Sequence, residues 1–379
     1  MIPIGALWDQ LVDCICRPPR DSYDIDALLG GTNGVFRIIN TIGYREDFEI
    51  YNKKGLKLVC SLFRPGTRSF DEPVPCVIYC HCNSGSRRDA EEAVWTLIPL
   101  GVAVVAFDFS GSGLSEGQWV TLGANEIDDL ECVVNHLRRY DTPPPAFLPE
   151  APISILPRVR VQSIGLWGRS MGAVTALNYG SKDPSIAGLV LDSAFSRLTD
   201  LMSEIVSEQK IPVPRALMRV ALAAMRRSVQ RRAGFDLSRV APIESAAGSF
   251  TPALFGHALG DKFVKMSHSE ALLKAYAGDK NLVKFEGDHN SLRPDFFYHS
   301  VSIFFYNTMR LEQLSKPPAS APSESIYDFL LAEGYEEELE SEKSEAGNVD
   351  EGTNLFAPHI NSDSTKNNGN APAVTTNTP

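Results

Sequence analysis

Apolar runs alternate with helix-like segments over most of the chain. The runs predicted as strands are 74–82, 102–109, 161–167, 187–191, 252–255 and 282–285. Nearly continuous apolar runs of this kind are typical of strands buried on both faces of a parallel sheet. Between them, apolar residues recur at the spacing of helices. The segments predicted as helices are 89–100, 124–139, 171–179, 267–276 and 296–311.

A β-hairpin is predicted before these alternating elements. Residues 48–51 and 56–63 flank the turn Asn52-Lys53-Lys54-Gly55. Strand–helix alternation after an antiparallel hairpin predicts a mostly parallel α/β sheet with helices on both faces. Two stretches interrupt the alternation. Residues 142–157 are rich in proline and are predicted to form a surface loop, whereas 196–248 read as a helical lid between two strands.

The first 20 residues have the pattern of an amphipathic helix. Apolar positions from Ile4 to Ile15 share one side, and Asp9 and Asp13 lie on the other. We expect this helix to pack on the body of the protein. The alternative is a helix on a membrane surface with S-acylated Cys14 and Cys16, although the acidic face disfavours it. No apolar run reaches the roughly 18 residues that a membrane-spanning helix needs.

Cysteine usage predicts a reducing compartment. The chain has seven cysteines, an odd number, and Cys76, Cys80 and Cys82 share one predicted strand and, by alternation, one face of it. Pairing within one buried strand is disfavoured, which indicates an intracellular protein. We therefore predict a cytoplasmic location, with membrane association through the N-terminal helix as the open alternative.

The net charge of −11 belongs almost wholly to the C-terminal segment. Residues 317–379 carry a net charge of −10, which leaves −1 for residues 1–316. This low-complexity tail is predicted to be disordered. The chain is thus divided into an N-terminal segment at 1–22, an α/β domain at 23–315 with its lid at about 196–248, and a tail at 316–379. Nothing in this charge pattern suggests the basic surface of a nucleic-acid-binding protein.

One motif carries candidate chemistry. Gly168-Arg169-Ser170-Met171-Gly172 matches G-x-S-x-G, with an apolar strand before it and a helix-like segment after it. In that context the motif forms a tight turn that presents the serine hydroxyl at the sheet edge. Glycines are needed where such a turn is strained and neighbouring backbone passes close. Ser170 is therefore the predicted nucleophile.

A serine nucleophile needs a base, and the base needs an orienting acid. Asp261 and His289 each follow a predicted strand and occur after Ser170 in the order Ser, acid, His. Asp192, at the end of an earlier strand, is the rival acid. Asp288 adjoins His289 and would struggle to face the correct ring nitrogen. His257 is expected to be a packed or hydrogen-bonded neighbour.

The oxyanion hole is predicted to use two backbone N–H groups. One belongs to Met171, the residue after the nucleophile, and the other to Asn83 in the loop after the strand at 74–82. No cofactor and no metal site is predicted.

Several motifs in order resemble the α/β-hydrolase superfamily, in particular a plant and protist branch identified as serine-aminopeptidase-like. The resemblance covers about residues 8–312. It implies the α/β-hydrolase fold, Ser170 as nucleophile, Asp261 as acid and His289 as base. The motifs that carry it are Arg17-Pro18-Pro19-Arg20, His81-Cys82-Asn83-Ser84-Gly85, Asp108-Phe109-Ser110-Gly111-Ser112-Gly113-Leu114-Ser115, Gly165-Leu166-Trp167-Gly168-Arg169-Ser170-Met171-Gly172-Ala173-Val174, Asp183-Pro184-Ser185-Ile186-Ala187-Gly188 and Phe285-Glu286-Gly287-Asp288-His289-Asn290-Ser291.

This sequence departs from the family at one position of the oxyanion loop. The family pattern is His-Gly-Asn, and Cys82 stands here in place of the glycine. If the loop needs a conformation open only to glycine, the N–H of Asn83 is misplaced, and Cys82→Gly would raise turnover. If the loop accepts a small side chain, the departure is neutral.

The sequence favours a serine hydrolase that cleaves an ester, thioester or amide through an acyl-enzyme. Acyl esters and thioesters are the favoured substrates, because no motif marks a receptor for the α-amine of an aminopeptidase substrate. The alternative is a non-catalytic α/β-hydrolase-fold binding or scaffold protein. Basic residues in the lid, among them Arg226 and Arg232, either form a solvated face, meet anionic head groups or bind the acidic tail.

Overall fold

The computed structural model of the protein describes residues 4–67, 72–139, 159–208 and 215–313. The Pro-rich segment 142–157 and the tail at 316–379 lie outside the described residues. Nine strands form a single sheet within the described part of the chain. The strands are β1 (Val35–Ile38), β2 (Thr41–Tyr51), β3 (Lys57–Pro65), β4 (Val74–Cys80), β5 (Ala103–Phe107), β6 (Val161–Arg169), β7 (Ile186–Asp192), β8 (Ala253–Ala258) and β9 (Lys280–Phe285).

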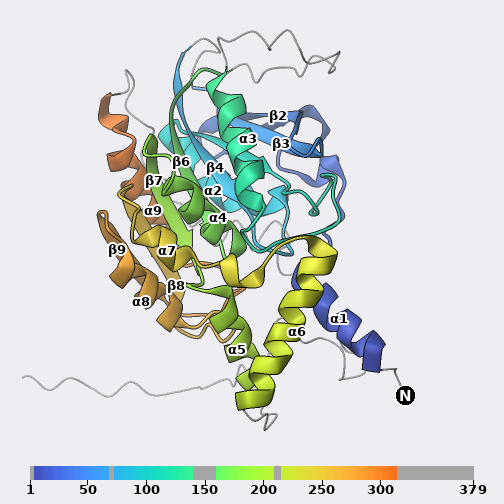
Figure 1. The fold of residues 1–379 in the computed structure, drawn as a ribbon. Helices are drawn as coiled ribbons and strands as arrows, with labels where there is room; N and C mark the ends of the chain where they lie inside the picture. Colours follow the sequence, from blue (N-terminus) through green and yellow to red (C-terminus); the bar gives the residue numbers. More distant parts are fainter. Residues whose placement is uncertain (1–3, 68–71, 140–158, 209–214, 314–379) are drawn as a thin grey trace, which may run out of the picture.

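Helices cover both faces of this sheet (Figure 1). The α-helices are α1 (Ile4–Cys16), α2 (Glu91–Leu97), α3 (Glu126–Arg138), α4 (Met171–Gly180), α5 (Leu198–Glu208), α6 (Arg215–Ala233), α7 (Pro242–Ala246), α8 (Met266–Ala275) and α9 (Asp295–Thr308). Short 3₁₀ helices are η1 (Ile25–Ala27), η2 (Gly31–Asn33), η3 (Arg87–Ala90), η4 (Ile98–Leu100), η5 (Leu237–Arg239) and η6 (Leu311–Gln313).

The sheet combines an antiparallel part with a parallel part. Its strand order is β1-β2-β3-β5-β4-β6-β7-β8-β9. Pairing is antiparallel from β1 to β5 and parallel from β5 through β4 to β9. The predicted mostly parallel sheet with an antiparallel opening hairpin is confirmed.

Two hydrophobic cores lie on the two faces of the sheet. Alternate residues of β4 supply them: Cys76 and Cys80 face the core beneath α3, α4 and α8, whereas Val77 and Tyr79 face the core beneath α2 and α9. This arrangement explains the continuous apolar runs, because a strand that is buried on both faces has no polar side.

The structure corrects three predicted elements. β1 was not predicted, since its four residues are too few for a clear pattern. The helix predicted at 89–100 is three pieces, η3, α2 and η4, and Pro99 in the last piece has no N–H for an α-helical hydrogen bond. β4 ends at Cys80, so Cys82 lies in the following loop rather than on the same strand face as Cys76.

The N-terminal helix packs against the lid. In Figure 1, α1 lies beside α6 near one end of the sheet. The Trp8 indole Nε1 donates to Ser228 Oγ at 3.0 Å, and Arg232 forms ion pairs with Asp9 and Asp13. Arg226 pairs with Asp236. Two of the lid arginines therefore already hold acidic partners within the described structure.

Cys16 is buried at the end of α1. Its thiol donates to the Val12 carbonyl oxygen at 3.2 Å. Burial, together with the charge of Asp13, raises the pKa of Cys16 to about 11. S-acylation at Cys16 would require α1 to leave its site. The side chain of Cys14 lies outside those that the structure describes, and none of the described helices has the length and apolar composition to cross a membrane.

Candidate active site

The predicted site residues meet at one edge of the sheet. Ser170 follows β6, Asp192 ends β7, Asp261 follows β8 and His289 follows β9. These four strands run parallel. Their carboxyl ends therefore share one edge, which is where sites form on open α/β sheets.

Ser170 occupies a strained turn between β6 and α4. Its φ is 52° and its ψ is −115°, a backbone conformation that residues with a side chain rarely adopt. A Cβ at Gly172 would lie 1.8 Å from the Cys80 carbonyl oxygen, and one at Gly168 would lie 2.3 Å from the Gly172 backbone. The two glycines of the motif are thus required by close backbone approach.

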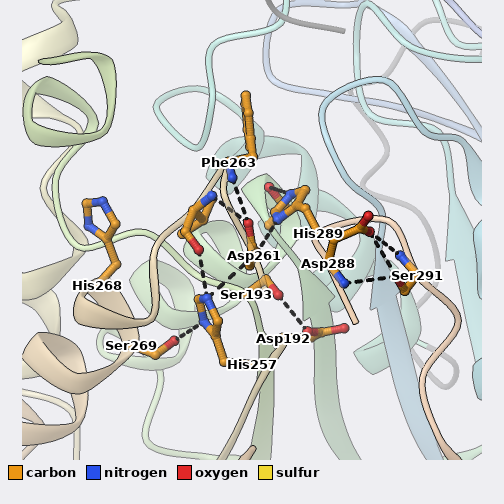
Figure 2. Close-up of polar contacts among 12 residues, drawn as sticks. Asp192, Ser193, His257, Asp261, Phe263, His268, Ser269, Asp288, His289 and Ser291 are labelled. Atoms are coloured by element: carbon orange, nitrogen blue, oxygen red, sulfur yellow. Dashed lines mark hydrogen bonds and ion pairs between the residues drawn. The ribbon is translucent and has the colours of Figure 1, made fainter. Parts of the chain in front are cut away.

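The structure brings Ser170, His289 and Asp261 into one hydrogen-bonded chain. His289 Nε2 lies 3.2 Å from Ser170 Oγ, and His289 Nδ1 lies 2.7 Å from Asp261 Oδ2. Figure 2 shows the Asp261 carboxyl and the His289 ring facing one another. In this arrangement Nδ1–H donates to the carboxylate and Nε2 is available to accept a proton from the serine hydroxyl.

The second oxygen of Asp261 is held by the backbone. Asp261 Oδ1 accepts hydrogen bonds from the N–H groups of Phe263 and Val264, at 2.9 and 2.7 Å. Asp261 is 6% exposed and Ser170 is 4% exposed. Both oxygens of the carboxylate are therefore used in a site largely closed to water, which fixes the orientation of the His289 ring.

His257 is engaged away from Ser170, as expected for a packed neighbour. Its Nδ1 lies 2.7 Å from Ser269 Oγ, and its Nε2 lies 2.7 Å from the Val264 carbonyl oxygen (Figure 2). Burial lowers its pKa, although Asp261, 3.6 Å from its Nε2, opposes that change.

Two other aspartates lie near His289 but are bound elsewhere. Asp192 Oδ2 accepts from Arg293 Nε at 2.8 Å, in an ion pair whose two side chains are wholly buried. Asp288 Oδ1 accepts from the N–H and the hydroxyl of Ser291, both at 2.9 Å (Figure 2). Neither carboxylate has a hydrogen bond to the His289 ring in the described structure.

Two arginines support His289 and were not singled out from the sequence. Arg169 Nη2 donates to the His289 carbonyl oxygen at 2.8 Å, and Arg293 Nη2 donates to the same oxygen at 3.1 Å. Asp192, which binds Arg293, also joins this group to the serine turn, since its backbone oxygen accepts from Ser170 N–H at 2.8 Å. The sequence offered one signal for this support, because Arg169 lies within the serine motif itself.

The predicted oxyanion loop follows β4. Its His81 is buried, and the ring spans two loops: Nδ1 lies 2.6 Å from the Cys82 carbonyl oxygen, and Nε2 accepts from Phe109 N–H at 3.1 Å. Burial lowers the His81 pKa, which favours the neutral ring that this pairing needs. His81 thus holds the loop in place.

The departure at Cys82 causes no backbone strain. Among the described non-glycine residues, those with positive φ are Ile39, Leu122, Ser170, Ser193 and Arg310. Cys82 is outside this group, so its backbone does not adopt a conformation reserved for glycine. The effect of Cys82 on the Asn83 N–H stays a prediction, which the turnover of Cys82→Gly tests. Asn83 and Ser170 line the same cavity. Met171 begins α4, and the N–H groups of a helix's first turn have no partner within the helix; both residues remain predicted oxyanion donors.

A small cavity of about 30 Å³ adjoins Ser170. Apart from Ser170 and Asn83, the described residues that line it are apolar. α5 contributes the largest share, and α1 and three loops supply the rest. The apolar side chains are Ile15, Leu122, Phe195, Leu198, Leu201, Met202, Ile205 and Phe263.

A mostly parallel sheet with a serine elbow after β6 and partner residues after β8 and β9 defines an α/β-hydrolase-fold protein. Residues 54–247, just over half of the chain, match the model of the X-Pro dipeptidyl-peptidase (S15) family. The chain belongs to this family. The matched region contains Ser170 and ends before Asp261 and His289.

Solved structures share the fold. The Pf2001 esterase of Pyrococcus furiosus has a TM-score of 0.52 and 19% identity, with coverage of 69% of this chain and 91% of that one. The acetyl xylan esterase of Paenibacillus sp. R4 has a TM-score of 0.51 and 15% identity, with coverage of 81% and 99%.

A curated relative is the uncharacterized protein YqkD of Bacillus subtilis. It is 27% identical over 218 residues, which are 56% of this chain and 64% of that protein. The chain therefore spans less than two thirds of the length of this relative.

Proposed function

We propose that the protein is a serine hydrolase that forms an acyl-enzyme on Ser170. The observation that carries this proposal is the chain of hydrogen-bond distances from Ser170 Oγ to His289 and on to Asp261. His289 accepts the serine proton as Oγ attacks the acyl carbon, and Asp261 stabilises the imidazolium that forms. His289 then protonates the leaving group, and a water molecule releases the acyl group by the reverse path.

The oxyanion of each tetrahedral intermediate is assigned to the backbone N–H groups of Met171 and Asn83. Such preorganised donors contribute most where water is excluded, and removal of one typically costs about 10²–10³ in rate. Ser170 is nearly inaccessible to water, which supports this assignment.

An acyl ester or thioester is the favoured substrate. The cavity at Ser170 offers apolar walls to an acyl group. The family description supplies a second candidate, cleavage of an X-Pro dipeptide from a peptide. That reaction needs a partner for a charged α-amine, and no charged side chain lines the described cavity.

Labelling with a fluorophosphonate probe tests the proposal. We expect the folded wild-type protein to be labelled, with the adduct mapped to Ser170 by mass spectrometry. Ser170→Ala should lose the label. Ser291→Ala is the matched control, because Ser291 lies two residues from His289 and its hydroxyl bonds to Asp288 instead. A folded wild-type protein that takes up no label would favour the non-catalytic scaffold.

A further inference from the structure

The cavity beside Ser170 has a chemistry and a size that point to a narrow class of ligand. Leu198, Leu201, Met202 and Ile205 recur at i, i+3, i+4 and i+7 and line it from one face of α5. Its volume is about 30 Å³. A single buried water needs a space of roughly 10–15 Å³, so this cavity is small and suits a short group.

The N-terminal helix closes part of this cavity. Ile15 of α1 is 3% exposed and lines the cavity, although it lies 155 positions before Ser170 in the sequence. Two hydrogen bonds hold α1 in place. At its end the Cys16 carbonyl oxygen accepts from Val120 N–H at 2.9 Å, and nearer its start Trp8 donates to Ser228 of α6. These contacts hold α1, and with it Ile15, against the cavity.

Leu122, a second apolar residue of the cavity wall, is also held in place. Leu122 has a φ of 55°, an uncommon conformation for a residue with a side chain. The buried carboxylate of Glu126 accepts hydrogen bonds from the N–H groups on either side, Thr121 at 2.6 Å and Gly123 at 2.9 Å. Strained residues persist only where the surroundings determine them, so this wall has a defined shape.

We propose that the cavity binds the acyl part of the substrate as a short, uncharged aliphatic group of about two to four carbons, and that Ile15 limits its length. The inference rests on the proposed serine hydrolase function. A protonated amine is excluded because it would lose its water without gaining an anionic partner. A longer chain is excluded by Ile15 and the α5 side chains.

The test is the chain-length dependence of kcat/KM for p-nitrophenyl esters from acetate to octanoate, with the full-length protein. Wild type should be fastest on acetate to butyrate. Ile15→Ala should raise the hexanoate-to-acetate ratio at least tenfold, since one methylene in an apolar pocket changes kcat/KM by about 10–200-fold. Ile15→Val should raise the hexanoate-to-acetate ratio by a smaller factor. Because it removes only one methylene, it tests the same wall even if Ile15→Ala loosens α1.

Val12→Ala is the matched control. Val12 is buried on the same helix, but it does not line the cavity, so the chain-length profile should stay that of wild type. Three results would overturn the inference. They are a preference of the wild type for octanoate, an unchanged chain-length profile in both Ile15→Val and Ile15→Ala, and faster cleavage of an X-Pro p-nitroanilide than of the acetate ester. A wild-type protein that neither hydrolyses any ester nor labels at Ser170 would instead refute the serine hydrolase itself.

Discussion

Asp261 and Asp192 both lie buried at the carboxyl edge of the sheet, but they are bound to different partners. Asp261 faces His289 Nδ1 and two backbone N–H groups. Asp192 faces the guanidinium of Arg293, which in turn holds the His289 carbonyl oxygen. The first carboxylate orients the imidazole ring, whereas the second joins the loop of Ser170 to the loop of His289. We therefore propose that Asp192 acts as a positioning residue.

These two roles predict different outcomes for two isosteric substitutions. Asp261→Asn should lower kcat by about 10⁴, because the amide favours the wrong tautomer of His289, with little change in stability. Asp192→Asn should instead destabilise the fold by about 3–5 kcal/mol, because it leaves Arg293 buried without its charge partner. Ester hydrolysis and urea unfolding measure the two effects. Equal losses of kcat with unchanged stability would make Asp192 the orienting acid.

At the scale of elements, α1 is joined to the lid helix α6. α1 contacts α6 by one hydrogen bond and the ion pairs of Arg232, and it buries Val12, Ile15 and Cys16 against the body. The Arg232 side chain is 30% exposed, and Asp9 and Asp13 are more so. Apolar burial, rather than charge, should therefore hold α1 in place.

We expect Val12→Ala to lower the free energy of unfolding by about 1–3 kcal/mol, as for other buried aliphatic truncations. Arg232→Ala should cost less than about 1 kcal/mol, because solvent screens its ion pairs. Urea unfolding at low and high salt measures both, and only the smaller effect of Arg232→Ala should vary with salt. A larger loss in Arg232→Ala than in Val12→Ala would show that the ion pairs dominate.

At the scale of the whole molecule, the described body is nearly neutral in formal charge, and several carboxyl groups are taken out of water. Asp89 is half-buried beside the predicted oxyanion loop, where its Oδ2 is 3.9 Å from Cys82 Sγ. Burial raises the pKa of Asp89 to about 7, even though the charge of Arg169 opposes the change. The folded protein therefore binds a proton at Asp89 more tightly than the unfolded chain does.

This raised pKa predicts the sign of a pH effect. Asp89 destabilises the fold as pH rises from about 4 to about 7, since ionisation is harder in the folded state. Asp89→Asn should therefore be more stable than wild type, and this difference in the free energy of unfolding should grow from pH 5 to pH 8. Its upper limit is about 4 kcal/mol, at roughly 1.4 kcal/mol per pKa unit. Urea unfolding at both pH values measures the difference. Asp24→Asn, at an exposed acid, is the control; a gain that is equal at the two pH values would contradict the prediction.

The sequence by itself determined most strands of the sheet, although not β1, and the turn at Ser170, because both depend on local features. Apolar runs mark strands buried on two faces, and the glycines of the serine motif allow close backbone approach. The order of Ser170, Asp261 and His289 along the chain narrowed the candidate site further.

Only the tertiary structure decided which groups meet. The pairing of Asp192 with Arg293, the two arginines on the His289 carbonyl oxygen and the place of Ile15 in the cavity join residues far apart in the sequence. No local pattern encodes such contacts, because they arise when strands and helices pack and their ends converge. Cys82 shows the same limit: the sequence could not tell which backbone conformation the loop has, and the structure shows that Cys82 has no positive φ.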